Sequence, residues 1–229
     1  MNIQLLPPSS SQLASQPGRA IAKVSFNPED KALAQAGSML AMSGNLSVST
    51  TLRNGRTVSR PQRWRGGGAT PKTLFLNQFY ATAPGHVLLA APLPGDLAVH
   101  TLTRQGLIAS SLAYLASTTA VELNLDSQTL PHCLTDQVMA PKGQFWLTFA
   151  GQGAVILGAL GGLYTVTVAQ AYRVAPHHVV AFEAGLEVTL LPASSSQFRT
   201  WLGDDQRVCH FQGQGKVYCQ THSGSAWCR

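Results

Sequence analysis

Residues 79–89 read Phe79-Tyr80-Ala81-Thr82-Ala83-Pro84-Gly85-His86-Val87-Leu88-Leu89, and the same form returns twice later in the chain. The later segments are Phe149-Ala150-Gly151-Gln152-Gly153-Ala154-Val155-Ile156-Leu157 and Phe211-Gln212-Gly213-Gln214-Gly215-Lys216-Val217-Tyr218-Cys219. Each has an aromatic residue, a turn of small residues, a glycine, one variable residue, and then valine with an apolar run. We predict a tight hairpin at each segment, in which the glycine supplies a positive φ and the flanking Phe and Val pair across the strands.

Short alternating runs surround these segments and indicate strands. Apolar and polar residues alternate over 46–52, 121–125, 164–168 and 186–190, which is typical of a strand with one buried face. Gly, Pro or Asn interrupts the runs at intervals of roughly 8–12 residues, and no stretch of helical length has an amphipathic helix pattern. The sequence therefore predicts an all-β protein with the composition of a sandwich, jelly roll or barrel.

A second element also occurs three times. Residues 36–42, 109–115 and 175–182 each form a turn followed by an apolar run that leads into an alternating strand. We therefore expect residues 22–229 to form a single domain of three divergent repeats around a pseudo-threefold axis. Residues 1–21 are rich in Ser, Pro and Gln and are expected to be a poorly ordered N-terminal lead-in.

The charge of the chain is low, and its excess is confined to one segment. Only 11% of the 229 residues are charged, against about 25% in an average soluble domain. The formal net charge is +6, and no Asp or Glu occurs between Lys31 and Gly95. An Arg-rich segment, residues 53–72, holds the candidate anion contacts, which are Arg53, Arg56, Arg60, Arg63, Trp64, Arg65 and Lys72.

Three partners would suit the Arg-rich segment. Arginines can contact a nucleic-acid backbone while the indole of Trp64 stacks on a base. An anionic lipid surface or an acidic protein would suit the same residues. The alternative is a solvated extension of a hairpin without a binding role.

No constellation typical of catalysis or of metal binding is present in the sequence. His177 and His178 are neighbours, so in a strand they would point to opposite faces. The spacings of His210 and His222 from the nearby cysteines match no zinc finger, and Asp204-Asp205 is typical of a turn. Without a G-x-S-x-G elbow either, we expect a protein that is not an enzyme and needs no cofactor or metal.

The cysteines and the hydropathy favour an intracellular protein. Cys133, Cys209, Cys219 and Cys228 include no C-x-x-C pair, so free thiols are expected, and a redox-dependent Cys209–Cys219 bridge is the alternative. The N-terminal residues lack the pattern of a secretory signal, and no apolar run reaches about 18 residues. We therefore expect a cytoplasmic location.

Four segments resemble a known family in their order along the chain. They are Gly37-Ser38-Met39-Leu40-Ala41-Met42-Ser43-Gly44, Leu93-Pro94-Gly95-Asp96, Val179-Val180-Ala181-Phe182 and residues 211–221. Together they resemble the altered-inheritance-of-mitochondria protein twenty-four family. The resemblance implies a compact β-helical or jelly-roll-like fold, similar to that of the tryptophan RNA-binding attenuation protein, with three pseudo-equivalent parts and no catalytic residues. It also implies, for the fungal members, an association with the mitochondrial inner membrane. The Arg-rich segment departs from the Gly-rich apolar stretch that the family often has there.

These observations together favour a non-catalytic scaffold or interaction protein. Low surface charge and short β-units with exposed edges favour association, so a homo-oligomer is expected. A protein or a membrane surface is a further expected partner. Nucleic-acid or anionic-surface binding through residues 53–72 is the alternative function.

Overall fold

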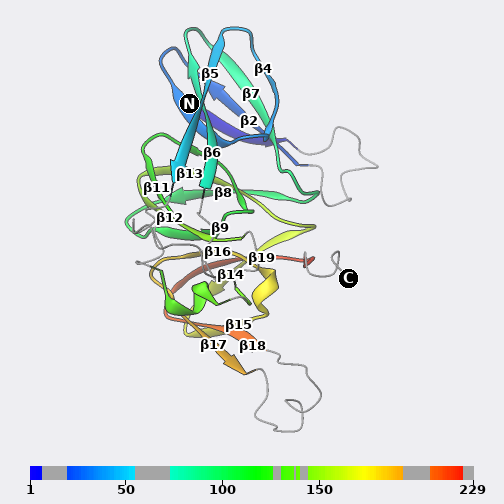
Figure 1. Cartoon of the computed structure of the whole chain (residues 1–229), viewed down its shortest axis with the longest axis vertical. Coiled ribbons are helices and arrows are strands. Elements are labelled where there is room, and N and C mark those ends of the chain that lie inside the picture. The colour runs from blue at the N-terminus through cyan, green and yellow to red at the C-terminus, as the bar shows by residue number, and fades with distance from the viewer. Residues whose placement is uncertain are drawn as a thin grey trace, which may run out of the picture.

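The computed structural model describes residues 1–6, 20–54, 73–125, 130–136, 138–139, 144–192 and 207–223. Strands dominate these ranges, and their helical elements are two 3-10 turns, η1 (His132–Thr135) and η2 (Pro176–His178). The strands form several open, antiparallel sheets that follow one another along the long axis of the molecule (Figure 1). The predicted all-β class is confirmed.

The strand order of each sheet shows how the chain is connected. The first sheet is β1 (Asn2–Leu6), β2 (Ile21–Phe26), β7 (Gly85–Ala90), β4 (Met39–Met42). The second is β5 (Leu46–Asn54), β6 (Thr73–Ala81), β3 (Lys31–Gln35), β10 (Tyr114–Thr118), β13 (Gly153–Gly158), β8 (Leu97–Leu102). The third is β11 (Val121–Asn124), β12 (Trp146–Gly151), β9 (Leu107–Ser110), β16 (Val179–Glu183), β19 (Gly215–Gln220), β14 (Leu163–Val168). The fourth is β15 (Ala171–Val174), β18 (Arg207–Gln212), β17 (Glu187–Pro192). Adding six to each strand number of the second sheet gives the third sheet.

The alternating pattern of the sequence determines which side chains enter the core. In β2, for example, Ala22, Val24 and Phe26 are buried, while the residues between them are partly exposed. Strands of this kind contribute one face each to three hydrophobic clusters, which are distributed along the molecule. Tyr114 and Phe149, with ring centroids 5.3 Å apart, are among the largest fully buried side chains of the central cluster.

The predicted hairpins at the three glycine turns are wrong. β6 and β7 belong to different sheets, as do β12 and β13, and β18 and β19. Phe79 lies opposite Ala32, and Val87 lies opposite Val24, so the two do not pair with each other. Each turn instead carries the chain from one sheet to the next, and the two strands that it joins pair with strands from elsewhere in the sequence.

Close approach is the common requirement at these glycines, rather than a positive φ. Gly153 has a φ of 141°, whereas Gly85 and Gly215 are not among the residues with positive φ. A Cβ on Gly85 would lie 2.6 Å from Leu46 Cδ1, and a Cβ on Gly215 would lie 3.0 Å from Leu186 Cγ. A side chain at either position would therefore crowd the apolar residue at the start of a neighbouring strand.

The structure describes a short strand at the start of the predicted N-terminal lead-in, residues 1–21. Asn2–Leu6 form β1, which pairs with β2 along the outer side of the first sheet. Ile3 and Leu5 pack against the buried cluster there, and the amino group of Met1 lies 2.8 Å from Asp30 Oδ2. Apolar burial and edge pairing stabilise this short strand. Residues 7–19 lie outside the described residues.

The segment Leu93-Pro94-Gly95-Asp96 connects β7 to β8, and it contacts the segment that connects β13 to β14. Gly95 forms an isolated parallel bridge with Gly161, and a Cβ on Gly95 would overlap the carbonyl oxygen of Ala159. Asp96 accepts a hydrogen bond from the backbone N–H of Leu163 at 3.1 Å through Oδ2. Glycine is required here because two backbones meet, and the carboxylate satisfies a donor at the start of β14.

Candidate functional site

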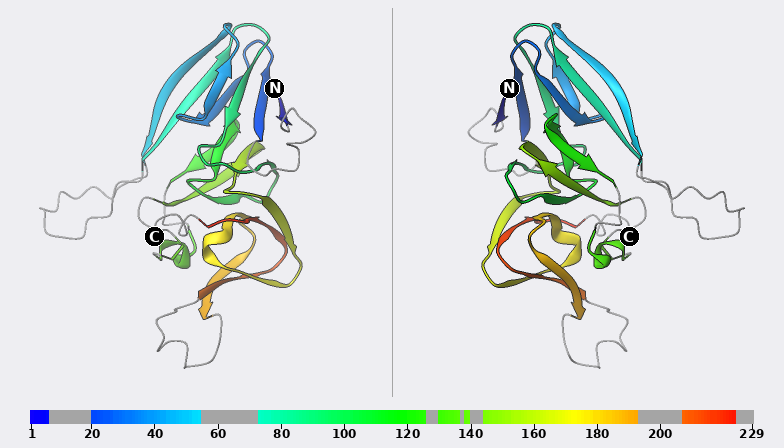
Figure 2. Two further views of the ribbon diagram at one scale, coloured as in Figure 1. Left: turned by 90° about the vertical axis from the view of Figure 1, so that its right-hand side faces the viewer. Right: turned by 90° about the vertical axis from the view of Figure 1, so that its left-hand side faces the viewer.

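Most of the Arg-rich segment falls outside the described residues. Six of the seven candidate anion contacts lie outside the described residues, so their role stays a prediction. They are Arg56, Arg60, Arg63, Trp64, Arg65 and Lys72. The backbone of Arg53 lies in β5 opposite Leu74 in β6. β5 and β6 form a long antiparallel ribbon at the edge of the second sheet, and its end beyond β3 leads toward this segment (Figure 2).

The ribbon carries an exposed apolar pair next to the Arg-rich segment. Leu52 in β5 lies opposite Phe75 in β6. Their exposed fractions are 50% and 57%, which is high for large apolar side chains. Apolar side chains beside a basic segment are typical of surfaces that contact an anionic bilayer or a protein.

Two sheet edges also expose apolar residues. β4 is the outer strand of the first sheet, and Met39, Leu40 and Met42 are 40%, 57% and 38% exposed. β15 is an outer strand of the fourth sheet, where Tyr172 is 44% exposed. We call these strands the β4 edge and the β15 edge. An edge strand has unpaired N–H and C=O groups, which a strand from another chain can bond.

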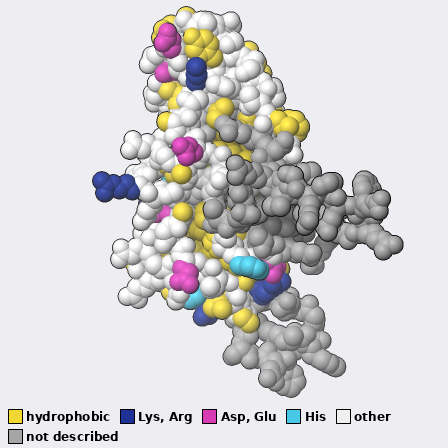
Figure 3. Space-filling view, turned by 60° about the vertical axis from the view of Figure 1, so that its left-hand side comes forward, with side chains coloured by type: hydrophobic (Ala, Val, Ile, Leu, Met, Phe, Trp, Pro, Cys, Tyr) yellow, Lys and Arg dark blue, Asp and Glu magenta, His cyan; other side chains and the backbone are white. Residues whose placement is uncertain are grey.

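Few charges surround the exposed apolar side chains. On the face shown in Figure 3, Lys, Arg, Asp and Glu side chains are few and are scattered among neutral ones. Lys31 does lie beside an aromatic side chain, with its Nζ 5.4 Å from the centroid of the Tyr80 ring.

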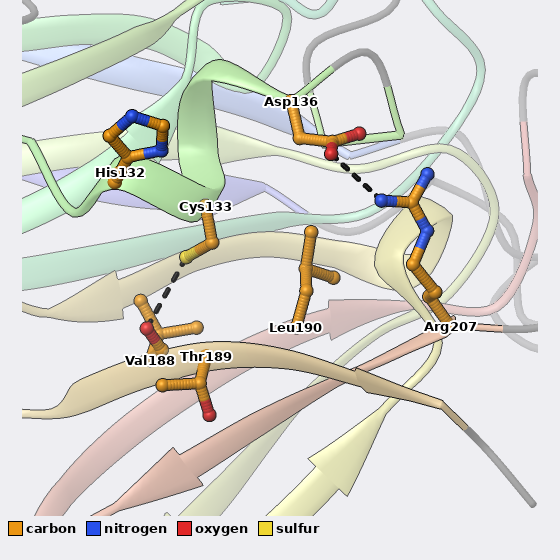
Figure 4. Close-up of a pocket in the computed structure, with 7 residues that line it drawn as sticks. All are labelled: His132, Cys133, Asp136, Val188, Thr189, Leu190 and Arg207. Carbon is orange, nitrogen blue, oxygen red and sulfur yellow. Dashed lines mark hydrogen bonds and ion pairs between the residues drawn. The ribbon is translucent and has the colours of Figure 1, made fainter.

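A hollow of about 690 Å³ lies between η1 and the fourth sheet (Figure 4). Arg207 Nη1 donates to Asp136 Oδ2 at 2.7 Å, and Asp136 Oδ1 accepts from the backbone N–H of Val138 at 2.9 Å. The pKa of Asp136 is lowered mainly by the hydrogen bond from Val138 and then by the one from Arg207. Cys133 donates its thiol hydrogen to the carbonyl oxygen of Val188, and burial raises the pKa of this thiol.

Hydrogen bonds and burial hold the carboxylate and the thiol of this hollow. Its carboxylate is held ionised by a guanidinium and a backbone amide, so it is a poor proton donor near neutral pH. Its thiol stays protonated because burial raises its pKa, which makes it a poor nucleophile. Asp136 looks isolated in the sequence because Arg207 lies 71 residues away, and no local pattern signals their contact.

The other cysteines with described positions are core residues. Cys209 and Cys219 are fully buried free thiols on β18 and β19, which do not pair with each other. Burial raises the pKa of Cys209 to about 12 and also raises that of Cys219. The hairpin that would bring Cys209 and Cys219 together for a bridge does not exist.

The rings of His178 and His100 form hydrogen bonds with residues distant in the sequence. His178 Nδ1 lies 2.7 Å from the carbonyl oxygen of Gln220, and the Gln220 amide donates to the carbonyl oxygen of His177 at 2.9 Å. His100 is buried, with Nδ1 2.8 Å from the Tyr218 hydroxyl, and burial lowers the pKa of its ring. The described ranges contain no group of three or more His, Cys, Asp or Glu side chains that could hold a metal ion. Within the same ranges, no helix has the length and hydropathy needed to cross a membrane.

Comparisons with known proteins identify the family. No match was found among curated proteins. The structure is similar to a crystal structure of protein SPYM3_0169 from Streptococcus pyogenes, with a TM-score of 0.69 and 16% sequence identity. That similarity covers 99% of this chain and 97% of the other, and at this identity it shows the fold alone. The family described as "Mitochondrial biogenesis AIM24" matches residues 13–222, and the chain therefore belongs to the AIM24 family.

Proposed function

We propose that this protein is a non-catalytic scaffold built from three six-strand units, and that it associates with copies of itself. The units are β2–β7, β8–β13 and β14–β19. The shift of six between the strand orders of the second and third sheets supports this division. A likeness to the tryptophan RNA-binding attenuation protein, a jelly-roll description, and a cytoplasmic location stay predictions.

Three matching irregularities support the repeated unit. The strand pairing shifts register between Met39 and Ala41 in β4, between Tyr114 and Ala116 in β10, and between Val179 and Ala181 in β16. Each of these strands is the third of its unit and pairs with the sixth. A β-bulge is a specific structural feature, so its recurrence at one position of each unit supports a common origin.

The exposure of the β4 edge carries the proposal of self-association. All four of its residues are exposed, whereas nearly every residue of β10 and β16 is buried. An apolar strand at a sheet edge is costly to leave in water and is prone to pair with another chain. The buried thiols and the ion-paired Asp136 support a non-catalytic role, because neither is poised for proton or group transfer.

The test is the mass of the protein in solution as a function of concentration. We expect light scattering to give masses above the 24.3 kDa of one chain, rising with concentration. Leu40→Lys should weaken association by about tenfold, because it places a charge in an apolar contact. Leu112→Lys is the matched control, since Leu112 is 43% exposed on a turn. A constant mass of one chain at every concentration would contradict the proposal.

A second candidate function is binding to an anionic surface through residues 53–72. The exposed pair of Leu52 and Phe75 favours it, because the pair is continuous along β5 and β6 with the Arg-rich segment. A lipid surface would accept both the apolar pair and the arginines. A protein partner and nucleic acid are the other occupants, and nucleic acid would use the arginines with Trp64.

Binding assays separate these occupants. We expect co-sedimentation with phosphatidylcholine vesicles that contain phosphatidylserine, and none with phosphatidylcholine alone. Leu52→Ser with Phe75→Ser should weaken this binding, while salt-dependent binding to single-stranded RNA should respond only to alanine at the arginines. The substituted arginines are Arg53, Arg56, Arg60, Arg63 and Arg65. Vesicle binding that survives loss of all five would contradict the role of the segment.

A further inference from the structure

Neighbouring units are joined by one kind of strand pair. In the second sheet, β3 of the first unit pairs with β10 of the second unit. In the third sheet, β9 of the second unit pairs with β16 of the third unit. Both pairs are antiparallel and three residues long. Each joins the second strand of one unit to the third strand of the next.

The register of the two junctions is the same. Ala34 lies opposite Ala116 in the first junction, and Ala109 lies opposite Ala181 in the second. Ala116 and Ala181 both directly follow the bulge of their strand. The equivalent residue of β4 is Ala41, which also follows the bulge.

The phenylalanines of the repeated segments align β15 with β3 and β9. Phe79 lies opposite Ala32 in β3, and Phe149 lies opposite Leu107 in β9. Phe211 lies opposite Tyr172 in β15. Tyr172 is therefore equivalent to Ala32 and Leu107, and Val174, two residues later, is equivalent to Ala34 and Ala109.

β4 and β15 are thus the two halves of a junction that the chain does not complete. Among the described strands, none pairs with the outer side of β4, whereas β10 and β16 each have a partner there. Within the part of the chain that the structure describes, the outer side of β15 is likewise unpaired, whereas β3 and β9 pair there with β10 and β16. Burial follows the same rule: β9 is buried at its first three residues, whereas β15 is exposed at its first three.

We infer that the β15 edge of one molecule pairs with the β4 edge of a second molecule and continues the series of units. The inference rests on the self-association proposed above and names its contact. The internal junctions give the register: Val174 opposite Ala41, Arg173 opposite Met42, and Tyr172 opposite Ser43. Strand addition of this kind satisfies the backbone groups of both edges and covers their apolar side chains.

The geometry makes this contact heterologous. β4 lies toward one end of the elongated molecule and β15 toward the other, so one molecule presents both edges to different neighbours (Figure 1). A head-to-tail contact propagates into a ring when its rotation closes, and into a filament when it does not. Each added molecule continues the sheets by the same pairing that joins its own units.

Arg173 lowers the affinity of the β15 edge for the β4 edge. It occupies the position of Leu33 and Ile108, which are buried at the internal junctions. A charged side chain at an edge weakens pairing and limits uncontrolled aggregation, while its aliphatic stem still covers the methionine opposite. The contact is therefore reversible and depends on concentration, unlike the covalently continuous junctions within the chain.

Disulfide trapping between two singly substituted chains tests this contact. Opposite residues in antiparallel strands have Cα atoms about 4.5–5.5 Å apart, which a disulfide can span. Chains that carry Arg173→Cys and Met42→Cys, both with Cys228→Ser, are mixed under mild oxidation and mapped by mass spectrometry. We expect a dimer joined by a disulfide between positions 173 and 42 in the mixture, and much less dimer from either chain alone. The same two substitutions in one chain should give a ladder of higher oligomers.

The control moves one cysteine by a single residue. Tyr172→Cys replaces Arg173→Cys, and because neighbours in a strand face opposite sides, it should not bond to Met42→Cys. If wild-type chains associate but position 173 does not crosslink to position 42, the inference fails while self-association stands. If the wild type keeps the mass of one chain and no crosslink forms, both fail. Dimers from one variant alone, in place of the mixture, would indicate an isologous contact and overturn the inference.

Discussion

Replacing Gly153 with alanine should destabilise the protein more than the same change at its two counterparts. Gly153 has a φ of 141°, and a Cβ there would overlap Thr118 Oγ1 and lie 3.1 Å from Val121 Cγ2. Backbone strain at positive φ costs roughly 1–2 kcal/mol, and an added methyl in a packed core costs about 1–3 kcal/mol. We therefore expect the free energy of unfolding to fall by about 3 kcal/mol, and the melting temperature by about 6–12 °C.

Three other glycines separate the two causes. Gly37 has a φ of 89°, and a Cβ on it would meet nothing within 4 Å, so Gly37→Ala reports strain alone, about 1–2 kcal/mol. Gly215 is not among the positive-φ residues and would meet only side-chain atoms of Leu186 and Glu183, so Gly215→Ala should cost under about 1 kcal/mol. Gly44→Ala has neither problem and should change little.

Urea unfolding of the four variants, followed by circular dichroism, measures these differences. The denaturant slope should stay the same, because the surface exposed on unfolding does not change. A loss for Gly153→Ala that is no larger than the loss for Gly37→Ala would refute the reasoning. The close approach to Thr118 would then place no restraint on the turn.

Three further results are expected. Asp136→Asn should lower the free energy of unfolding by about 0.5 kcal/mol at pH 7, because the ion pair with Arg207 is partly exposed. Since the pKa of Asp136 is lowered from 3.8, that stabilisation is present above pH 3.8 and is lost as the pH falls through the lower folded-state value; urea titrations at several pH values would show it. Burial lowers the pKa of His100, so the neutral ring is favoured in the fold and stability should fall as the pH drops below 6.5. In His100→Gln this part of the pH dependence should be absent from melting curves between pH 5 and 8, and an unchanged slope would contradict the assignment. Arg173→Leu should strengthen association severalfold in light scattering, because it restores the apolar residue type of the internal junctions; weaker association would speak against pairing at Met42.

The strands were predictable because their signal is local. The alternation at 46–52 and 164–168 reports which residues of one strand face the core, and β5 and β14 lie there. The family was predictable for a related reason. The family motifs are short runs of consecutive residues such as Leu93–Asp96, in which Gly95 meets the backbone of Ala159 and Asp96 accepts a hydrogen bond from Leu163.

Strand partners were not predictable in the same way. The segment around Gly85 looks like a hairpin because a small-residue turn separates two apolar runs, yet β6 and β7 pair with strands from elsewhere. The hollow beside η1 was missed for the same reason, since Asp136 and Arg207 are 71 residues apart in the sequence and are in contact only in the tertiary structure. The Arg-rich residues stay a prediction, because most of them lie outside the described residues.

The sequence by itself determined the all-β class, the position of most strands, and membership of the family. These follow from the period-two alternation and from short motifs, which are properties of consecutive residues. The tertiary structure alone decided which strands pair, and so which edges remain open. Closing a long loop costs little more than closing a short one, so partner choice leaves no mark on local sequence. The exposure of β4 and β15 is therefore visible only after every internal junction has found its partner.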